Sequence, residues 1–128
     1  MDVRFKPVMQ HQPMLLPADV SELIPAGAMV RVVDGMVDLL DRERIDALYP
    51  GGGAPAYDPV MLLKVVLFSY AQGVYSSRKI AKATGQDLHV MWLCGLQPIS
   101  HNTINRFRSA RIQPVFEAIF AEMIEMLA

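Results

Sequence analysis

A run of twelve residues, 60–71, constrains the fold of this chain more than any other segment. It reads VMLLKVVLFSYA, with Lys64 as its only charge. Because the run is shorter than the roughly twenty apolar residues that cross a bilayer, it predicts a helix that is buried on most of its circumference. Asp58 offers a capping carboxylate, Pro59 suits the first turn, and Gly73 offers a C-terminal stop. The other segments must supply the surfaces that cover this helix.

The composition is that of a single folded domain. The chain has 128 residues, of which 52% are hydrophobic and 20% charged, so it can bury a core unaided. Cys94 is the only cysteine, and no His or Cys lies at zinc-finger spacing, so we expect no disulfide, no metal and no cofactor. The N-terminus is interrupted by charges and prolines and lacks a signal-peptide core. We expect a cytoplasmic protein with no membrane segment and no small-molecule substrate.

Helical periodicity begins after an irregular N-terminal segment. The first 25 residues contain four prolines and no sustained period, which predicts an extended N-terminal arm (1–25) ahead of a helical domain (26–128). Between residues 28 and 49, apolar side chains recur at steps of three and four, which predicts one amphipathic helix or two. These side chains are Val30, Val33, Val37, Leu40, Ile45 and Leu48. The predicted fold is an all-α, compact helical bundle.

The segment VRVVDG, residues 30–35, permits a second interpretation. It resembles a strand that ends in an exposed aspartate, as nuclease folds use to bind metal ions, and this would make Asp34 catalytic. The helical period argues against a strand, and no second strand-borne carboxylate follows to share a metal. The glycine triplet at 51–53 has no following Lys-Ser or Lys-Thr, so we interpret it as a connecting loop. No catalytic residue is predicted.

The net charge of −1 conceals an uneven distribution along the chain. Residues 1–63 hold five basic and nine acidic side chains, residues 64–111 hold seven basic and one acidic, and residues 112–128 hold three acidic and no basic. Such asymmetry is typical of proteins that bind polyanions. Helical spacing gathers the middle charges onto faces, which favours binding over the alternative of a solvated basic surface.

A helix with an outward basic face is predicted at residues 77–84, SRKIAKAT. Ser76 or Ser77 can cap its N-terminus, and Gly85 follows its last turn. Helical spacing points Ile80 inward. The cations on the opposite face are Arg78, Lys79 and Lys82. The charge distribution favours a polyanion as the partner of this face.

Small residues at 81 and 85 suit a close helix crossing, and they suggest a helix-turn-helix whose second helix is DLHVMWLC, residues 87–94. This second helix offers mainly apolar side chains, which fill cores better than they read base edges. They are Val90, Met91, Trp92 and Leu93. We therefore place Trp92 in the core and reject this helix as the recognition element.

The stretch SHNTINRFRSAR gives the preferred helix-turn-helix interpretation. Ser100 caps its helix, and Ile104 and Phe107 anchor it inward. The opposite face collects Asn102, Asn105, Arg106 and Ser109. Asparagine can pair with adenine and arginine with guanine in the major groove, whereas Arg108 and Arg111, nearer the packed edge, suit phosphates. The alternative is a solvated surface helix, although the glutamates and lysines that are usual on such surfaces are absent here.

Two blocks of the sequence, YDPVMLLKVVLFSYAQGVYSSRKIAKAT and MWLCGLQPISHNTINRFR, carry a resemblance to a known family. They resemble the N-terminal domain of bacterial insertion-sequence transposases, the InsH-like group with a DDE catalytic domain. The resemblance runs from about Ile24 to the C-terminus. It implies a helical domain that binds double-stranded DNA at the element's terminal inverted repeats through residues 76–84 and 100–111. The chain departs from the family pattern at AGAM (26–29) and at Ser100-His101, and neither departure removes a cap.

The chain ends at Ala128, before the region in which that family's catalytic Asp, Asp and Glu are found. The resemblance therefore implies the DNA-binding domain of a transposase without its catalytic domain, and we expect no enzymatic activity. The single acidic residue of the middle block also offers little to an active site.

The C-terminal segment PVFEAIFAEMIEMLA predicts a helix that starts at Pro114. Its apolar stripe comprises Phe116, Ile119, Phe120, Met123, Met126 and Leu127. The stripe either folds onto its own core or pairs with a second copy to make a homodimer. Pairing would favour an alternative function, a helical protein-interaction module or a truncated remnant that modulates full-length transposase.

Overall fold

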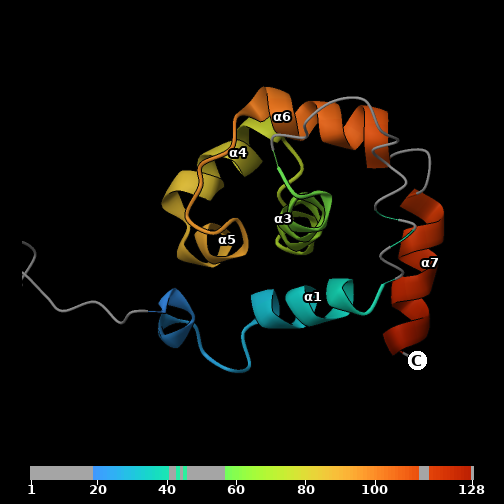
Figure 1. Cartoon of the computed structure of the whole chain (residues 1–128), viewed down its shortest axis with the longest axis horizontal. Helices are drawn as coiled ribbons and strands as arrows, with labels where there is room; N and C mark the ends of the chain where they lie inside the picture. Colours follow the sequence, from blue (N-terminus) through green and yellow to red (C-terminus); the bar gives the residue numbers. More distant parts are fainter. Residues whose placement is uncertain (1–18, 41–42, 44, 46–56, 113–115, 128) are drawn as a thin grey trace, which may run out of the picture.

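The structure is a computed structural model, and it describes residues 19–40, 43, 45, 57–112 and 116–127 (Figure 1). In these residues every regular element is helical and none is a strand, so the all-α prediction is confirmed. The elements are η1 (Val20–Leu23), α1 (Met29–Asp38), α3 (Pro59–Ala71), α4 (Ser77–Gln86), α5 (Leu88–Leu93), α6 (His101–Arg106), the π-helical η2 (Phe107–Ile112) and α7 (Phe116–Leu127).

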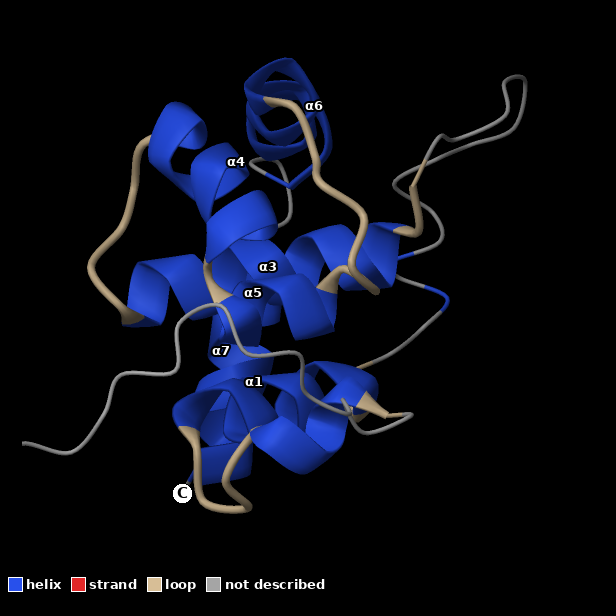
Figure 2. Ribbon diagram, turned by 90° about the vertical axis from the view of Figure 1, so that its left-hand side faces the viewer, coloured by secondary structure: helices blue, strands red, loops and turns tan. Residues whose placement is uncertain are grey.

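Helix α3 occupies the centre, with α1, α4, α5 and η2 packed against it (Figures 1 and 2). Apolar residues around its whole circumference are buried, as expected for a helix with no polar face. The helix begins where the sequence predicts, because the Asp58 carboxylate accepts a hydrogen bond of 2.9 Å from the Val60 amide and Pro59 occupies the first turn.

Helix α3 ends at a left-handed glycine. Gly73 has a φ of 76°, its amide donates to the Tyr70 carbonyl at 3.0 Å, and the Val74 amide donates to the Ser69 carbonyl at 2.8 Å. This is the Schellman arrangement, which satisfies two carbonyls of the last turn. Gly95, with a φ of 61°, closes α5 in the same way. The stop at Gly73 was predicted from the sequence.

Helix α1 lies across α3 and confirms the predicted amphipathic helix (Figure 2). Its inward residues Val30, Val33 and Val37 are buried as predicted, and so are Leu40 and Ile45 beyond its end. The alternative of a metal-binding strand ending at Asp34 is wrong, because Asp34 lies within a helix. Leu48 and the glycine triplet fall outside the described residues.

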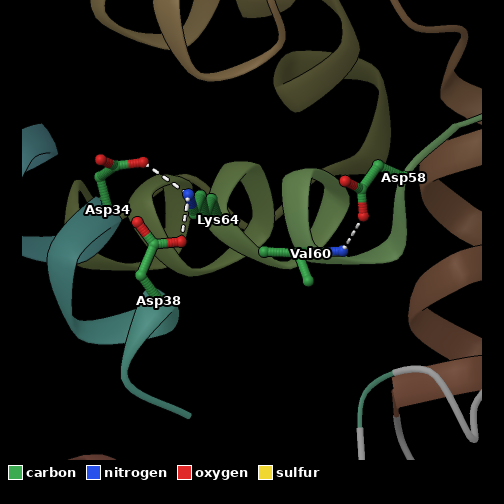
Figure 3. Close-up of polar contacts among 5 residues, drawn as sticks. All are labelled: Asp34, Asp38, Asp58, Val60 and Lys64. Atoms are coloured by element: carbon green, nitrogen blue, oxygen red, sulfur yellow. Dashed lines mark hydrogen bonds and ion pairs between the residues drawn. The ribbon is translucent and has the colours of Figure 1, made fainter. Parts of the chain in front are cut away.

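Lys64, the single charge of α3, lies between two carboxylates of α1 (Figure 3). Its Nζ is 2.7 Å from an Asp34 oxygen and 2.8 Å from an Asp38 oxygen, and its side chain is 14% exposed. Burial lowers the pKa of Lys64, but the two carboxylates outweigh burial and the pKa is raised overall. Lys64 therefore contributes to the fold and not to the outward basic face for which the charge count included it.

The N-terminal segment differs in part from the extended arm expected over residues 1–25. Residues 20–23 form the 3-10 turn η1, and Ile24 is buried. The Arg31 guanidinium donates to the carbonyls of Ser21, Ile24 and Pro25, which ties the turn to α1. Hydrogen bonds from a guanidinium to backbone carbonyls stabilise such a compact turn even where prolines lie nearby. Residues 1–18 are not described.

Trp92 corrects another prediction, since it lies at the edge of the core and not inside it. Its side chain is partly exposed, and the Arg31 guanidinium carbon lies 5.2 Å from its ring centroid. An indole is rarely buried completely, and a cation over its face suits a boundary position.

Helix α7 lies beside α1 (Figures 1 and 2). Ile119 is buried and Met123 packs against the core, so this part of the stripe folds onto its own chain. Pro114 and the side chains of Phe116, Phe120, Met126 and Leu127 lie outside the described set. Among the described residues, no helix combines the length and the apolar character that a bilayer crossing requires.

The ion pairs of Lys64 yield a stability prediction. Replacing Lys64 with methionine leaves Asp34 and Asp38 close together without their shared cation, so we expect the free energy of unfolding to fall by about 1–3 kcal/mol. The matched variant, in which Lys64→Met is combined with Asp34→Asn and Asp38→Asn, should recover most of this loss. Urea unfolding followed by circular dichroism measures both. Equal loss in the single and triple variants would mean that the carboxylates do not need the lysine.

Candidate functional site

The candidate site is built on the packing of α4 against α6 (Figures 1 and 2). On α4, the four-residue spacing of Ser77, Ala81 and Gly85 places small residues in one row. Ser77 accepts a hydrogen bond from Arg108, and a Cβ added to Gly85 would lie 4.0 Å from the Pro98 Cβ. This row of α4 therefore faces η2 and the loop that precedes α6, and not α5 alone.

Thr84 holds the segment that leads into α6. Its side chain is buried, and its hydroxyl accepts a hydrogen bond of 2.9 Å from the Ile99 amide and donates at 2.5 Å to the Ala81 carbonyl. Thr84 thereby ties α4 to the residue before the Ser100 cap. Sequence reasoning missed this role, since the only signal was a threonine four residues after the inward Ile80.

Helix α6 presents the faces that its sequence predicts. The Ser100 hydroxyl accepts a hydrogen bond of 3.3 Å from the Thr103 amide, and Ile104 and Phe107 are buried. The outward face is exposed at all four predicted positions, Asn102, Asn105, Arg106 and Ser109. The predicted orientation of this helix is therefore confirmed.

Beyond Arg106 the helix widens into the π-helical η2. The Ser109 hydroxyl donates a hydrogen bond of 2.8 Å to the Asn105 carbonyl. Ser109 thus satisfies a carbonyl of its own helix, as serine and threonine often do where a helix departs from α geometry. Short π-helical segments are frequent at functional sites. No local pattern in the sequence predicted this one.

The three predicted cations of α4, Arg78, Lys79 and Lys82, are all exposed. Arg78 and Lys82 each follow one position after the row that faces α6, so they border the contact between the two helices. Lys79 and Lys82 also line an open hollow of about 470 Å³ at the junction of α4 and α5. Its other lining residues are Ala83, Gln86, Asp87 and Leu88.

Arg108 differs from the other cations because it is engaged within the protein. It is half-buried, its Nη1 donates to the Ser77 hydroxyl at 2.9 Å, and its guanidinium carbon lies 5.4 Å from the centroid of the Tyr70 ring. This position near the packed edge agrees with the sequence prediction. The contacts of the guanidinium, however, direct the side chain toward the protein and not toward solvent. The side chain of Arg111 lies outside those that the structure describes.

Groups suited to covalent or metal chemistry are sparse in the described part of the chain. Within it, no three His, Cys, Asp or Glu side chains cluster as a metal site would require. Burial raises the pKa of the Cys94 thiol, which disfavours the reactive thiolate.

Comparison with known protein families gives a match over most of the chain. The model of the family described as "Transposase domain (DUF772)" matches residues 18–110, which include the helices from α1 to α6. Searches of curated proteins and of solved structures returned no match.

The Thr84 bonds yield a second stability prediction. Thr84→Val keeps the shape of the side chain but leaves the buried Ile99 amide without its acceptor, so the free energy of unfolding should fall by about 1–3 kcal/mol. Thr84→Ser keeps the hydroxyl and should cost less than the valine variant. Urea midpoints compare the two. A serine variant that is less stable than the valine variant would show that the methyl group matters more than the hydrogen bond.

Proposed function

The chain belongs to the transposase domain family DUF772, and from this premise we propose that it serves transposition by binding double-stranded DNA at the ends of the mobile element. The observation that carries the proposal is the two-sided character of α6. One side is anchored by Ile104 and Phe107, while the other exposes Asn102, Asn105 and Arg106. Amide and guanidinium groups are the side chains that pair bidentately with adenine and guanine in the major groove.

The arrangement of α4 and α6 supports a helix-turn-helix role. Helix α4 packs directly against α6, and the Thr84 bond to Ile99 fixes the start of the second helix. In this scheme α6 enters the major groove while α4 crosses above the phosphate backbone. Helix α5 fills the connection between them, with Val90 and Leu93 buried.

The exposed cations of α4 suit the phosphates. Arg78 and Lys82 border the face of α6, so both helices can meet the same duplex, with α4 supplying electrostatic attachment and α6 supplying sequence discrimination. Binding, and not strand transfer, is the role we assign to the described residues, acting on DNA in the bacterial cytoplasm.

The test compares two arginines with different expected duties. Arg106→Ala should cost about 1–3 kcal/mol at the preferred duplex and reduce discrimination between sequences, because a base contact is lost. The matched variant Arg78→Ala should weaken all duplexes about equally and lower the slope of log affinity against log salt by about one. Selection from random duplexes supplies the target, and fluorescence anisotropy across salt concentrations measures affinity.

Two results would contradict the proposal. One is an affinity and a salt slope that neither substitution changes, which would make the polar face of α6 a solvated surface. The other is a wild-type protein that binds all duplexes alike at every salt concentration, since it would lack the sequence discrimination that element ends require.

A further inference from the structure

Arg108 joins three helices through a single side chain. It lies in η2, next to the buried Phe107, and its guanidinium contacts both Ser77 at the start of α4 and Tyr70 in the last turn of α3. The Tyr70 ring also packs against the ring of Tyr75, with centroids 5.6 Å apart. The first turn of η2 is therefore held against the last turn of α3 and the first turn of α4.

The chemistry of this contact is specific to arginine. A guanidinium is planar, so it can lie over an aromatic face while its edge donates to an acceptor at the side. The ammonium of lysine is a compact, strongly hydrated charge that lacks the planar fork. The arrangement of Tyr70, Arg108 and Ser77 uses both properties of the guanidinium.

The position of Arg108 relative to the outward face makes the contact functionally relevant. Arg106 and Arg108 are two residues apart, so they point to nearly opposite sides of the helix, and accordingly Arg106 is exposed while Arg108 is half-buried. The apolar contacts of Ile104 and Phe107 are not directional, whereas the hydrogen bonds at the two ends are. Thr84 fixes the segment before α6, and Arg108 fixes the segment after it.

We propose that Arg108 is a positioning residue, which sets the rotation of α6 and so aims Asn102, Asn105 and Arg106 without itself binding phosphate. This inference rests on the proposed function. It replaces the phosphate contact predicted for Arg108 from its place along the helix. Misaiming a recognition helix degrades the base contacts that depend on direction, while the phosphate contacts of other residues persist.

The experiment separates a positioning role from a phosphate contact by salt dependence. The variants are Arg108→Lys, which keeps the charge, and Ser77→Ala and Tyr70→Leu, which remove the partners and alter no charge. Each is titrated against the selected duplex and a scrambled duplex across salt concentrations, with circular dichroism confirming the fold. For positioning, we expect all three variants to lose about tenfold in the ratio of the two affinities, with an unchanged salt slope.

A phosphate role gives the opposite pattern. Arg108→Lys would then retain most of the discrimination, Ser77→Ala and Tyr70→Leu would bind like the wild type, and Arg108→Met would lower the salt slope by about one. Any of these three results overturns the positioning role. If one substitution prevents folding, Ser77→Ala, which deletes a single half-buried hydroxyl, still distinguishes the two outcomes.

Failure of the proposed function would look different from failure of this inference. The wild-type protein and Arg106→Ala are titrated in the same series. If the wild type shows no preference for the selected duplex, the proposed function itself fails. If the wild type discriminates and Arg106→Ala does not, the DNA proposal stands, and the Arg108, Ser77 and Tyr70 variants decide the positioning role alone.

Discussion

Burial of α3 on every side is the constraint on which the other elements depend. A helix with apolar residues around its circumference cannot face water, so several amphipathic elements must surround it, each turning one stripe inward. Helices α1, α4 and α5 and the π-helical η2 do so. The only charge of this helix, Lys64, is accommodated because α1 presents Asp34 and Asp38 at a spacing of one helical turn. One of these elements, α4, carries the candidate interface together with α6, which packs against it.

Features set by neighbouring residues could be predicted from the sequence. The starts of α3 and α6 follow from Asp58 and Ser100, whose side chains reach amides two or three positions ahead. The end of α3 follows from Gly73, and the inward turn of Ile104 follows from helical periodicity. Capping, left-handed stops and amphipathic faces involve groups within one or two turns, so a local pattern contains the necessary information.

Features that join distant segments could not be predicted in this way. The ion pairs of Lys64 span about thirty positions of sequence, and Arg108 reaches Ser77 across 31. A count of charges treats both cations as free to bind a partner. In the folded chain, Lys64 forms ion pairs with two carboxylates, and Arg108 contacts Ser77 and Tyr70. Leu96 adopts a left-handed φ of 66° in the connection that follows α5, which a bulky apolar residue rarely does. At such positions the tertiary fold determines the conformation and the contacts of a residue, and its local preference does not.

The division of cations between folding and binding limits how the candidate interface can act. Of the basic side chains described between residues 64 and 108, Lys64 and Arg108 have partners inside the protein, while Arg78, Lys79, Lys82 and Arg106 are exposed. With about 0.9 counterions released per phosphate contact, the three exposed cations of α4 contribute up to about −2.7 to the slope of log affinity against log salt. This contribution is smaller than the salt dependence of proteins that make six to ten phosphate contacts. Under the proposed function, base contacts from α6 add to this electrostatic contribution, so the aim of that helix and the contacts that hold it affect both affinity and discrimination.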